Sequence, residues 1–241
     1  MAVRPIIFSA PMVKALLAGT KTQTRRVAKI TAIMGNRVAI TSPDESLIEL
    51  EPGEFKRGVF HYLSTGPLSG PYDARFAVGD VLYVREQARG QGWDPAGDWE
   101  YFSVQYAADN VTRIARVPNA GICKPYRYPE FTSGRFMPRW ASRLTLAVTD
   151  VRVERLQDIS EADAQAEGIR RMDDGTWSWS EDAKVVGWHT PRGAFDALWT
   201  SINGPAAWAE NPWVVALTFT VHRQNVDQYL AALASDDRRA G

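Results

Sequence analysis

The segment Gly19-Thr20-Lys21-Thr22-Gln23-Thr24-Arg25-Arg26 places hydroxyl groups, an amide and several cations next to one another. A lysine beside a threonine can activate the hydroxyl as a nucleophile when burial lowers the lysine pKa. Lys21 and Thr24 share a face if the segment forms a helical turn, and they point in opposite directions in an extended strand. A solvated basic loop without catalytic function is the alternative interpretation.

A carboxyl group far along the sequence is the second candidate. Residues 160–163 (S-E-A-D) are typical of a capping box that opens a short helix, and Glu167 falls in its last turn, just before Gly168. The backbone dipole disfavours a negative charge at that end of a helix, which suits a carboxyl group that transfers protons. A surface glutamate with no chemical role is the alternative.

Two groups of residues that include aromatic side chains have a composition typical of nucleic-acid contacts. Arg135 and Arg139 flank aromatic and apolar residues before a predicted strand, where they can contact a phosphate or stack on a base. Ordinary surface arginines would show the same pattern. A tryptophan cluster lies in a polar segment: Trp177, Trp179 and Trp188. Exposed tryptophans stack on bases, and packing within the protein is the alternative for this cluster.

The overall charge limits the kind of nucleic-acid partner. The 241 residues carry 28 basic and 28 acidic side chains, so the formal net charge is zero. Proteins that coat long duplexes usually have a basic excess. We therefore expect a local site for a modified nucleoside or a short single strand, with RNA preferred over duplex DNA.

Several other classes of protein find no support in the sequence. Cys123 is the only cysteine, and the three histidines lack metal-ligand spacing, so we expect no disulfide, no metal site and no cofactor. The sequence motifs of nucleotide phosphate binding, dinucleotide binding, zincins and nucleophile elbows do not occur. No apolar run is long enough for a bilayer and the N-terminus lacks a signal-peptide pattern, so we expect a cytoplasmic location without membrane contact.

Periodicity and turn residues predict the elements that must position these side chains. Strands are predicted at residues 4–9, 37–41, 81–86, 103–107, 140–156 and 212–221, and helices at 9–19, 160–167, 190–202 and in the tail 227–241. Residues 21–26 are predicted to form a polar loop. This mixture predicts an α+β fold with a closed or nearly closed β-barrel, in a single domain over residues 1–241. Long loop insertions are expected at 42–72, 110–134 and 170–189.

Taken together, several segments resemble the ASCH family of the PUA-like superfamily. They are residues 15–26 (A-L-L-A-G-T-K-T-Q-T-R-R), 79–86 (G-D-V-L-Y-V-R-E), 148–168 and 213–221. The ordered pair of G-x-K-T-x-T-x-R and a later G-D-x-L-x-V is the specific part, and the similarity covers about half of the chain. The resemblance implies a PUA-like β-barrel with flanking short helices. Longer proteins similar to this one are frequent in bacteriophage and prophage genomes, which implies such an origin.

The resemblance also implies a reaction. Compact bacterial ASCH proteins include amidohydrolases that remove the acyl group from N4-acetylcytidine, with a Lys, a Thr and a Glu as the proposed catalytic set. Lys21, Thr24 and Glu167 match these positions. By this resemblance Lys21 takes a proton from Thr24, Thr24 attacks the acyl carbon, and Glu167 protonates the departing amine. Arg26 or backbone N–H groups would hold the oxyanion.

Seven polar residues are assigned to substrate or nucleic-acid binding: Thr22, Arg25, Arg26, Arg85, Glu86, Arg135 and Arg139. Other ASCH proteins are thought to bind RNA without turnover. A non-catalytic protein that binds RNA or a modified DNA base is therefore the alternative function, and a phage protein that acts through partner contacts is a third.

Overall fold

The computed structural model describes residues 1–27, 38–41, 47–50, 76–93, 101–117, 130–180 and 187–240. The chain is α+β and divides into two compact units, each built from separate stretches of the sequence. The first unit comprises Thr20–Gly79 and Val148–Phe219 together with Met1, and the second comprises Ala2–Gly19, Asp80–Ala147 and Thr220–Gly241.

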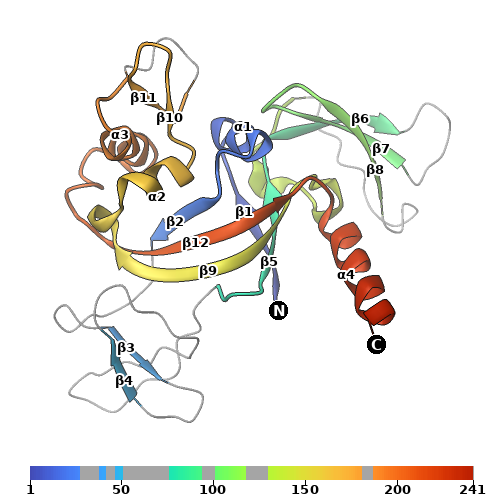
Figure 1. Cartoon of the computed structure of the whole chain (residues 1–241). Helices are drawn as coiled ribbons and strands as arrows, with labels where there is room; N and C mark the ends of the chain where they lie inside the picture. Colours follow the sequence, from blue (N-terminus) through green and yellow to red (C-terminus); the bar gives the residue numbers. More distant parts are fainter. Residues whose placement is uncertain are drawn as a thin grey trace. The chain divides into compact units, whose positions relative to one another are not determined.

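A five-stranded sheet contains the longest strands (Figure 1). Its strands are β1 (Val3–Ile7), β2 (Gln23–Val27), β5 (Val81–Arg85), β9 (Thr145–Arg155) and β12 (Trp213–His222), of which β9 and β12 are the long ones. The strand order is β1-β5-β9-β12-β2, in which β1 runs parallel to β5, whereas β5 with β9 and β12 with β2 are antiparallel. No pairing among the described strands joins β2 back to β1, so this sheet does not show the closed barrel expected from the sequence.

The segment that carries Lys21 is extended, and its prediction as a loop is wrong. Helix α1 (Ala10–Ala18) ends at Gly19, whose φ of 76° is the left-handed conformation that glycine adopts without strain. Lys21 then forms a β-bridge with Glu167, and β2 begins at Gln23. Pairing with β12 makes this polar sequence a strand, because tertiary context overrides local preference.

Two helices of the first unit pack against each other, α2 (Glu161–Ala166) and α3 (Pro191–Asn203) (Figure 1). The capping box at α2 is confirmed in part, since Ser160 Oγ accepts a hydrogen bond from the Asp163 N–H at 3.0 Å. The shorter elements of this unit are β3 (Val38–Thr41), β4 (Leu47–Leu50), η3 (Leu156–Asp158), β10 (Arg170–Arg171) and β11 (Trp177–Ser178). Of the predicted insertion at 42–72, only β4 lies within the described residues.

A three-stranded antiparallel sheet is the main feature of the second unit. Its order is β6 (Ala88–Trp93), β7 (Tyr101–Tyr106) and β8 (Thr112–Arg116). Phe102, Val104 and Tyr106 form a buried cluster with Met137 and Ala141. The sequence predicted only β7: Gly90 and Gly92 weaken the alternation of β6, and β8 falls in the stretch 110–134 that was predicted to be irregular. Residues 118–129 of that stretch lie outside the described residues.

Three further elements complete the second unit. The 3-10 helix η1 (Gly134–Phe136) precedes the predicted strand at 140–156, and the 3-10 helix η2 (Arg139–Ala141) takes the place of its start, so that β9 begins only at Thr145. Helix α4 (Val226–Ala240) confirms the helix predicted in the tail, and Val226 packs in a cluster with Val81 and Tyr83 of β5. None of the helices in the described part of the chain is both long and apolar enough to cross a membrane.

A buried ion pair anchors the three-stranded sheet within the second unit. Arg143 Nε and Nη2 lie 2.8 and 2.9 Å from the two carboxylate oxygens of Glu86, and Nη1 lies 2.8 Å from Asp109 Oδ2. The guanidinium carbon lies 4.0 Å from the ring centroid of Tyr106. Burial raises the pKa of Glu86, and Arg143 opposes that rise. Glu86, which was assigned to ligand binding, is therefore engaged inside the protein.

Replacing Arg143 with lysine is expected to destabilise the protein by about 1–3 kcal/mol, the cost of leaving a buried polar group unsatisfied. The ammonium group of lysine cannot form the bidentate contact with Glu86, and it cannot stack on Tyr106 as a planar guanidinium does. Urea unfolding followed by far-UV circular dichroism measures the change. Arg116→Lys, at an exposed position of β8, is the matched control. Equal stability of the two variants would contradict the anchoring role.

Candidate proton-transfer site

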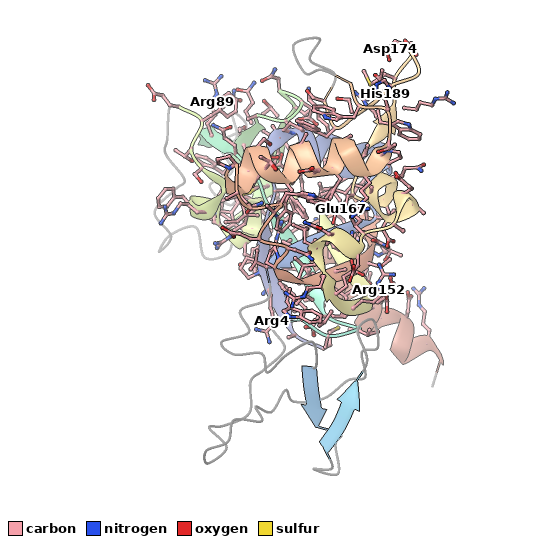
Figure 2. The ribbon with its side chains drawn as sticks, turned by 90° about the vertical axis from the view of Figure 1, so that its left-hand side faces the viewer. Arg4, Arg89, Arg152, Glu167, Asp174 and His189 are labelled. Carbon is pink, nitrogen blue, oxygen red and sulfur yellow. The ribbon has the colours of Figure 1, made fainter. Side chains whose placement is uncertain are left out.

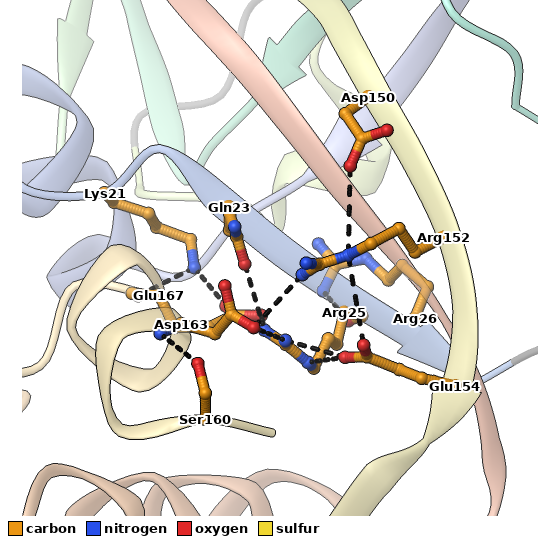
Figure 3. Close-up of polar contacts among 10 residues, drawn as sticks. All are labelled: Lys21, Gln23, Arg25, Arg26, Asp150, Arg152, Glu154, Ser160, Asp163 and Glu167. Atoms are coloured by element: carbon orange, nitrogen blue, oxygen red, sulfur yellow. Dashed lines mark hydrogen bonds and ion pairs between the residues drawn. The ribbon is translucent and has the colours of Figure 1, made fainter. Parts of the chain in front are cut away.

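Lys21 and Glu167 meet although 146 positions separate them in the sequence (Figure 3). Nζ of Lys21 lies 2.6 Å from Oε2 of Glu167 and donates to the backbone oxygen of the same residue at 2.8 Å. The Lys21 side chain is completely buried and that of Glu167 is 3% exposed. Thr20 and Thr22 on either side are exposed, so this segment lies at the surface of its unit while the ammonium group points inward.

The end of helix α2 explains why the two groups meet. Glu167 is the C-terminal cap of α2, and Gly168 follows it with φ of 100°. The Thr22 N–H donates to the Ala166 oxygen at 2.8 Å, which ties the start of the β2 segment to the helix end. Lys21 thus places a cation at a helix C-terminus, where the helix dipole favours positive charge. The contact therefore has a structural role whatever its chemistry.

The surroundings of Lys21 alter its acidity. Burial lowers the pKa of the ammonium group below its ordinary value of 10.5, and the charge and hydrogen bond of Glu167 partly offset this. The charges of Arg26 and Arg25 lower the pKa further. A lysine with a lowered pKa gives up its proton more readily, which is the property that proton transfer requires.

Arg25 holds Glu167 from the other side. Its side chain is completely buried and reaches three carboxylates: Nε lies 2.8 Å from Glu154, Nη1 lies 3.2 Å from Oε1 of Glu167, and Nη2 lies 3.3 Å from Asp163. Each oxygen of Glu167 therefore has its own cation, Arg25 on Oε1 and Lys21 on Oε2. This arrangement fixes the orientation of the carboxylate toward Lys21.

Arg152 extends the cluster toward the edge of the unit (Figure 3). Its Nη2 lies 3.1 Å from Oδ2 of Asp163, the oxygen that also pairs with Arg25. Although burial acts to raise it, a hydrogen bond from Gln23 and the charges of Arg152 and Arg25 hold the pKa of Asp163 below its ordinary value. Asp163 thus remains an anion that keeps Arg25 in place.

Thr24 is not brought to Lys21. Side chains alternate between the faces of an extended chain, and Lys21 and Arg25 both contact Glu167 from one face. By this alternation Thr24, which is 1% exposed, lies on the opposite face of the strand. Arg26, two residues further along, lies on the same face as Thr24. Thr22 is exposed and half-buried Arg26 donates to the Arg25 oxygen at 3.5 Å.

The remaining predicted binding residues lie in the second unit. Arg85 Nη1 donates to the Arg135 oxygen at 3.2 Å. The guanidinium carbons of Arg85 and Arg139 lie 5.6 and 5.8 Å from the ring centroid of Tyr83. The structure thus brings Arg85 and Arg139 to one aromatic side chain and links Arg85 to the backbone of Arg135, whereas Glu86 pairs with Arg143.

The tryptophan cluster packs largely against itself. The rings of Trp179 and Trp188 stack with centroids 4.9 Å apart, and Trp177 exchanges two backbone hydrogen bonds with Trp188. All three are half-buried. Figure 2 shows Glu167 among the packed side chains of this unit, while Asp174 and His189 lie toward its edge.

Sequence reasoning missed the carboxylates and the arginine that surround Arg25. Arg152 and Glu154 of β9 alternate with buried Val151 and Val153, so a charged face on this strand was readable from the sequence. Asp163 was interpreted only as part of a helix cap. The sequence of β9 did not indicate which residue this charged face binds, because that residue, Arg25, lies on β2.

No family model matches the chain, no curated protein matches its sequence, and no solved structure matches its fold. Among the described residues, no group of three or more histidine, cysteine, aspartate or glutamate side chains is arranged to hold a metal ion. The chemistry of the site therefore has to be argued from Lys21, Glu167 and Arg25.

Proposed function

We propose that the chain hydrolyses the amide of an N4-acylated cytosine nucleoside, with Lys21 and Glu167 as the proton-transfer pair, on an ASCH-like fold of the PUA-like superfamily. One observation carries the proposal: a completely buried lysine with a lowered pKa lies 2.6 Å from a buried carboxylate. Buried ionisable groups with altered pKa values are common in active sites. The resemblance of residues 15–26 and 79–86 to the ASCH family supplies the substrate class.

The pair contains both groups that amide hydrolysis needs. When the ammonium proton moves from Lys21 Nζ to Glu167 Oε2, the ion pair becomes a neutral amine and a carboxylic acid. The amine takes a proton from water as the water oxygen bonds to the acyl carbon. The acid then protonates N4 as the carbon–nitrogen bond breaks. The products are a carboxylic acid and the free cytosine amine, and the Lys21–Glu167 ion pair is restored.

Water takes the place that the family resemblance gives to Thr24, because the strand directs Thr24 away from Lys21. Thr24→Val is therefore expected to change turnover by less than about fivefold, whereas loss of a covalent nucleophile costs orders of magnitude. Valine has nearly the shape of threonine and suits this buried strand position. Steady-state hydrolysis of N4-acetylcytidine measures the effect, and a loss approaching that of a Lys21 variant would restore Thr24 as the nucleophile.

The pH dependence of turnover follows from the shared proton. The active form of the pair holds one proton between Lys21 and Glu167, so activity falls when rising pH removes it. Because burial lowers the pKa of Lys21, we expect this alkaline loss to have its midpoint below 10.5. A kcat profile from pH 6 to 11 locates the midpoint. Activity that keeps rising through pH 10.5 would contradict the proposed protonation state.

The first experiment is a hydrolysis assay of the purified protein against N4-acylated cytosines, cytidines and deoxycytidines. Release of the free base or nucleoside is followed by chromatography, with Glu167→Gln beside the wild type. Glutamine keeps the shape of the side chain but cannot give up a proton. Turnover of at least one substrate that is lost in Glu167→Gln supports the proposal. No turnover of any substrate by folded protein would reject it.

A further inference from the structure

We infer that Arg85, Arg135 and Phe136 of the second unit form a binding site for a nucleotide, with the arginines on a phosphate group and the phenylalanine ring against the base. The inference does not rest on the proposed hydrolysis. Its starting point is a half-buried arginine that has no acidic partner in the described part of the chain.

Arg85 has no carboxylate partner among the residues that the structure describes. A guanidinium has five N–H donors, and within the described part of the chain the Arg85 side chain makes one hydrogen bond to another residue, from Nη1 to the Arg135 oxygen at 3.2 Å. Nε is buried and lacks a partner among the described residues. A buried guanidinium nitrogen is normally hydrogen-bonded. The unused donors of Arg85 therefore suit an incoming anion.

Gly134 fixes the position of the neighbouring residues. A Cβ atom there would lie 3.0 Å from the backbone carbonyl carbon and oxygen of Arg85, so only glycine allows η1 to approach the end of β5 this closely. The approach places Arg135 beside the end of β5, where its backbone oxygen accepts the hydrogen bond from Arg85. Arg135 is exposed, with its guanidinium carbon 5.1 Å from the Phe136 ring centroid.

The local charge favours an anionic ligand. Arg139 lies near the same Tyr83 ring as Arg85 but is neutralised by Asp227, whose Oδ1 lies 2.5 Å from its Nη2. Within the described residues Asp227 is the only carboxylate that pairs with any of these three arginines. Two positive charges, on Arg85 and Arg135, therefore have no compensating carboxylate among the residues that the structure places.

The exposed ring of Phe136 indicates which kind of anion the two arginines bind. Phe136 is 58% exposed, so a ligand can reach its ring. Base stacking on aromatic side chains is a common way to bind single-stranded nucleic acid, and arginine suits phosphate because of its planar set of donors. The combination fits a nucleotide, either free or within a single strand.

Isothermal titration calorimetry with four probes tests the site: cytidine, cytidine 5′-monophosphate, inorganic phosphate, and a cytidine hexanucleotide without terminal phosphates. We expect the monophosphate or the hexanucleotide to bind roughly tenfold or more tightly than cytidine, because charge-assisted hydrogen bonds to phosphate are strong. Arg85→Gln should weaken this binding by roughly tenfold or more. Phe136→Ser should weaken it by about fivefold or more through loss of stacking.

Arg171→Gln is the matched control, because it removes one positive charge from an exposed residue of β10 in the other unit. Binding of the monophosphate identifies a mononucleotide as the ligand, and binding of the hexanucleotide alone identifies an internal phosphodiester. Equal affinity of wild type and Arg85→Gln for both probes would overturn the site. Binding of inorganic phosphate as tightly as the monophosphate, with no effect of Phe136→Ser, would overturn the part assigned to the base.

Discussion

With arginine in place of Lys21, turnover of an N4-acylated cytosine nucleoside is expected to fall by about 10²- to 10⁴-fold, the range that a general acid–base group contributes. Arginine stays protonated at every accessible pH, so it cannot deliver its proton to Glu167 and then accept one from water. It nevertheless keeps a positive charge beside the carboxylate and at the end of α2. The variant therefore separates proton transfer from the capping role of Lys21.

The measurement is kcat and KM for the best substrate of the hydrolysis panel, together with urea unfolding of the same preparation. Lys14→Arg, at an exposed position of α1, is the control for a lysine-to-arginine change. We expect kcat to fall in Lys21→Arg while the protein remains folded. A folded variant with the kcat of the wild type would show that Lys21 acts only as a cap.

Arg25→Met should destabilise the protein by about 3–5 kcal/mol, the usual cost of removing one partner from a buried ion cluster. Methionine fills part of the space but leaves Glu154, Asp163 and Glu167 without the cation that they share. Lys21 still pairs with Glu167 and Arg152 with Asp163, but each carboxylate loses its contact with Arg25, and incompletely paired buried charges are costly. This loss is expected to exceed that of Arg143→Lys, which keeps a positive charge in its site.

Urea unfolding followed by both tryptophan fluorescence and far-UV circular dichroism gives the change in unfolding free energy and tests whether one transition describes it. Arg171→Met, at an exposed residue of the same unit, is the control and is expected to change stability by less than about 0.5 kcal/mol. A loss below about 1 kcal/mol in Arg25→Met would mean that the carboxylates find other partners or water.

Local patterns predicted those elements whose boundaries depend on neighbouring residues. Gly19 ends α1, Ser160 caps α2, and the apolar alternation of 212–221 became β12, because capping and side-chain periodicity act over a few residues. β2 could not be predicted in this way. Its polar residues are buried only because β12, α2 and the charged face of β9 surround them, and no local pattern encodes those partners.

The candidate site likewise combines features that the sequence predicted with features that it could not predict. Lys21 and Glu167 were singled out from residue type and family resemblance, and the structure puts them in contact. The spacing of Lys21 and Thr24 left two geometries open, and the extended conformation of the segment decides against a shared face. Arg25 was assigned to ligand binding because its sequence neighbours are polar. In the structure its guanidinium group pairs instead with three carboxylates from β9 and α2.

The position of β2 in the sheet also governs when the Lys21 site can be built during synthesis. In the described sheet β2 pairs only with β12, and β2 begins at residue 23 whereas β12 begins at residue 213. At the usual ribosomal rate of roughly 5–20 residues per second, about 10–40 seconds separate the appearance of the two strands. During that interval the backbone groups of β2 that pair with β12 have left the ribosome without their partner. Nascent chains shortened before residue 213 should therefore lack the Lys21–Glu167 contact, however well α1 and α2 form on their own.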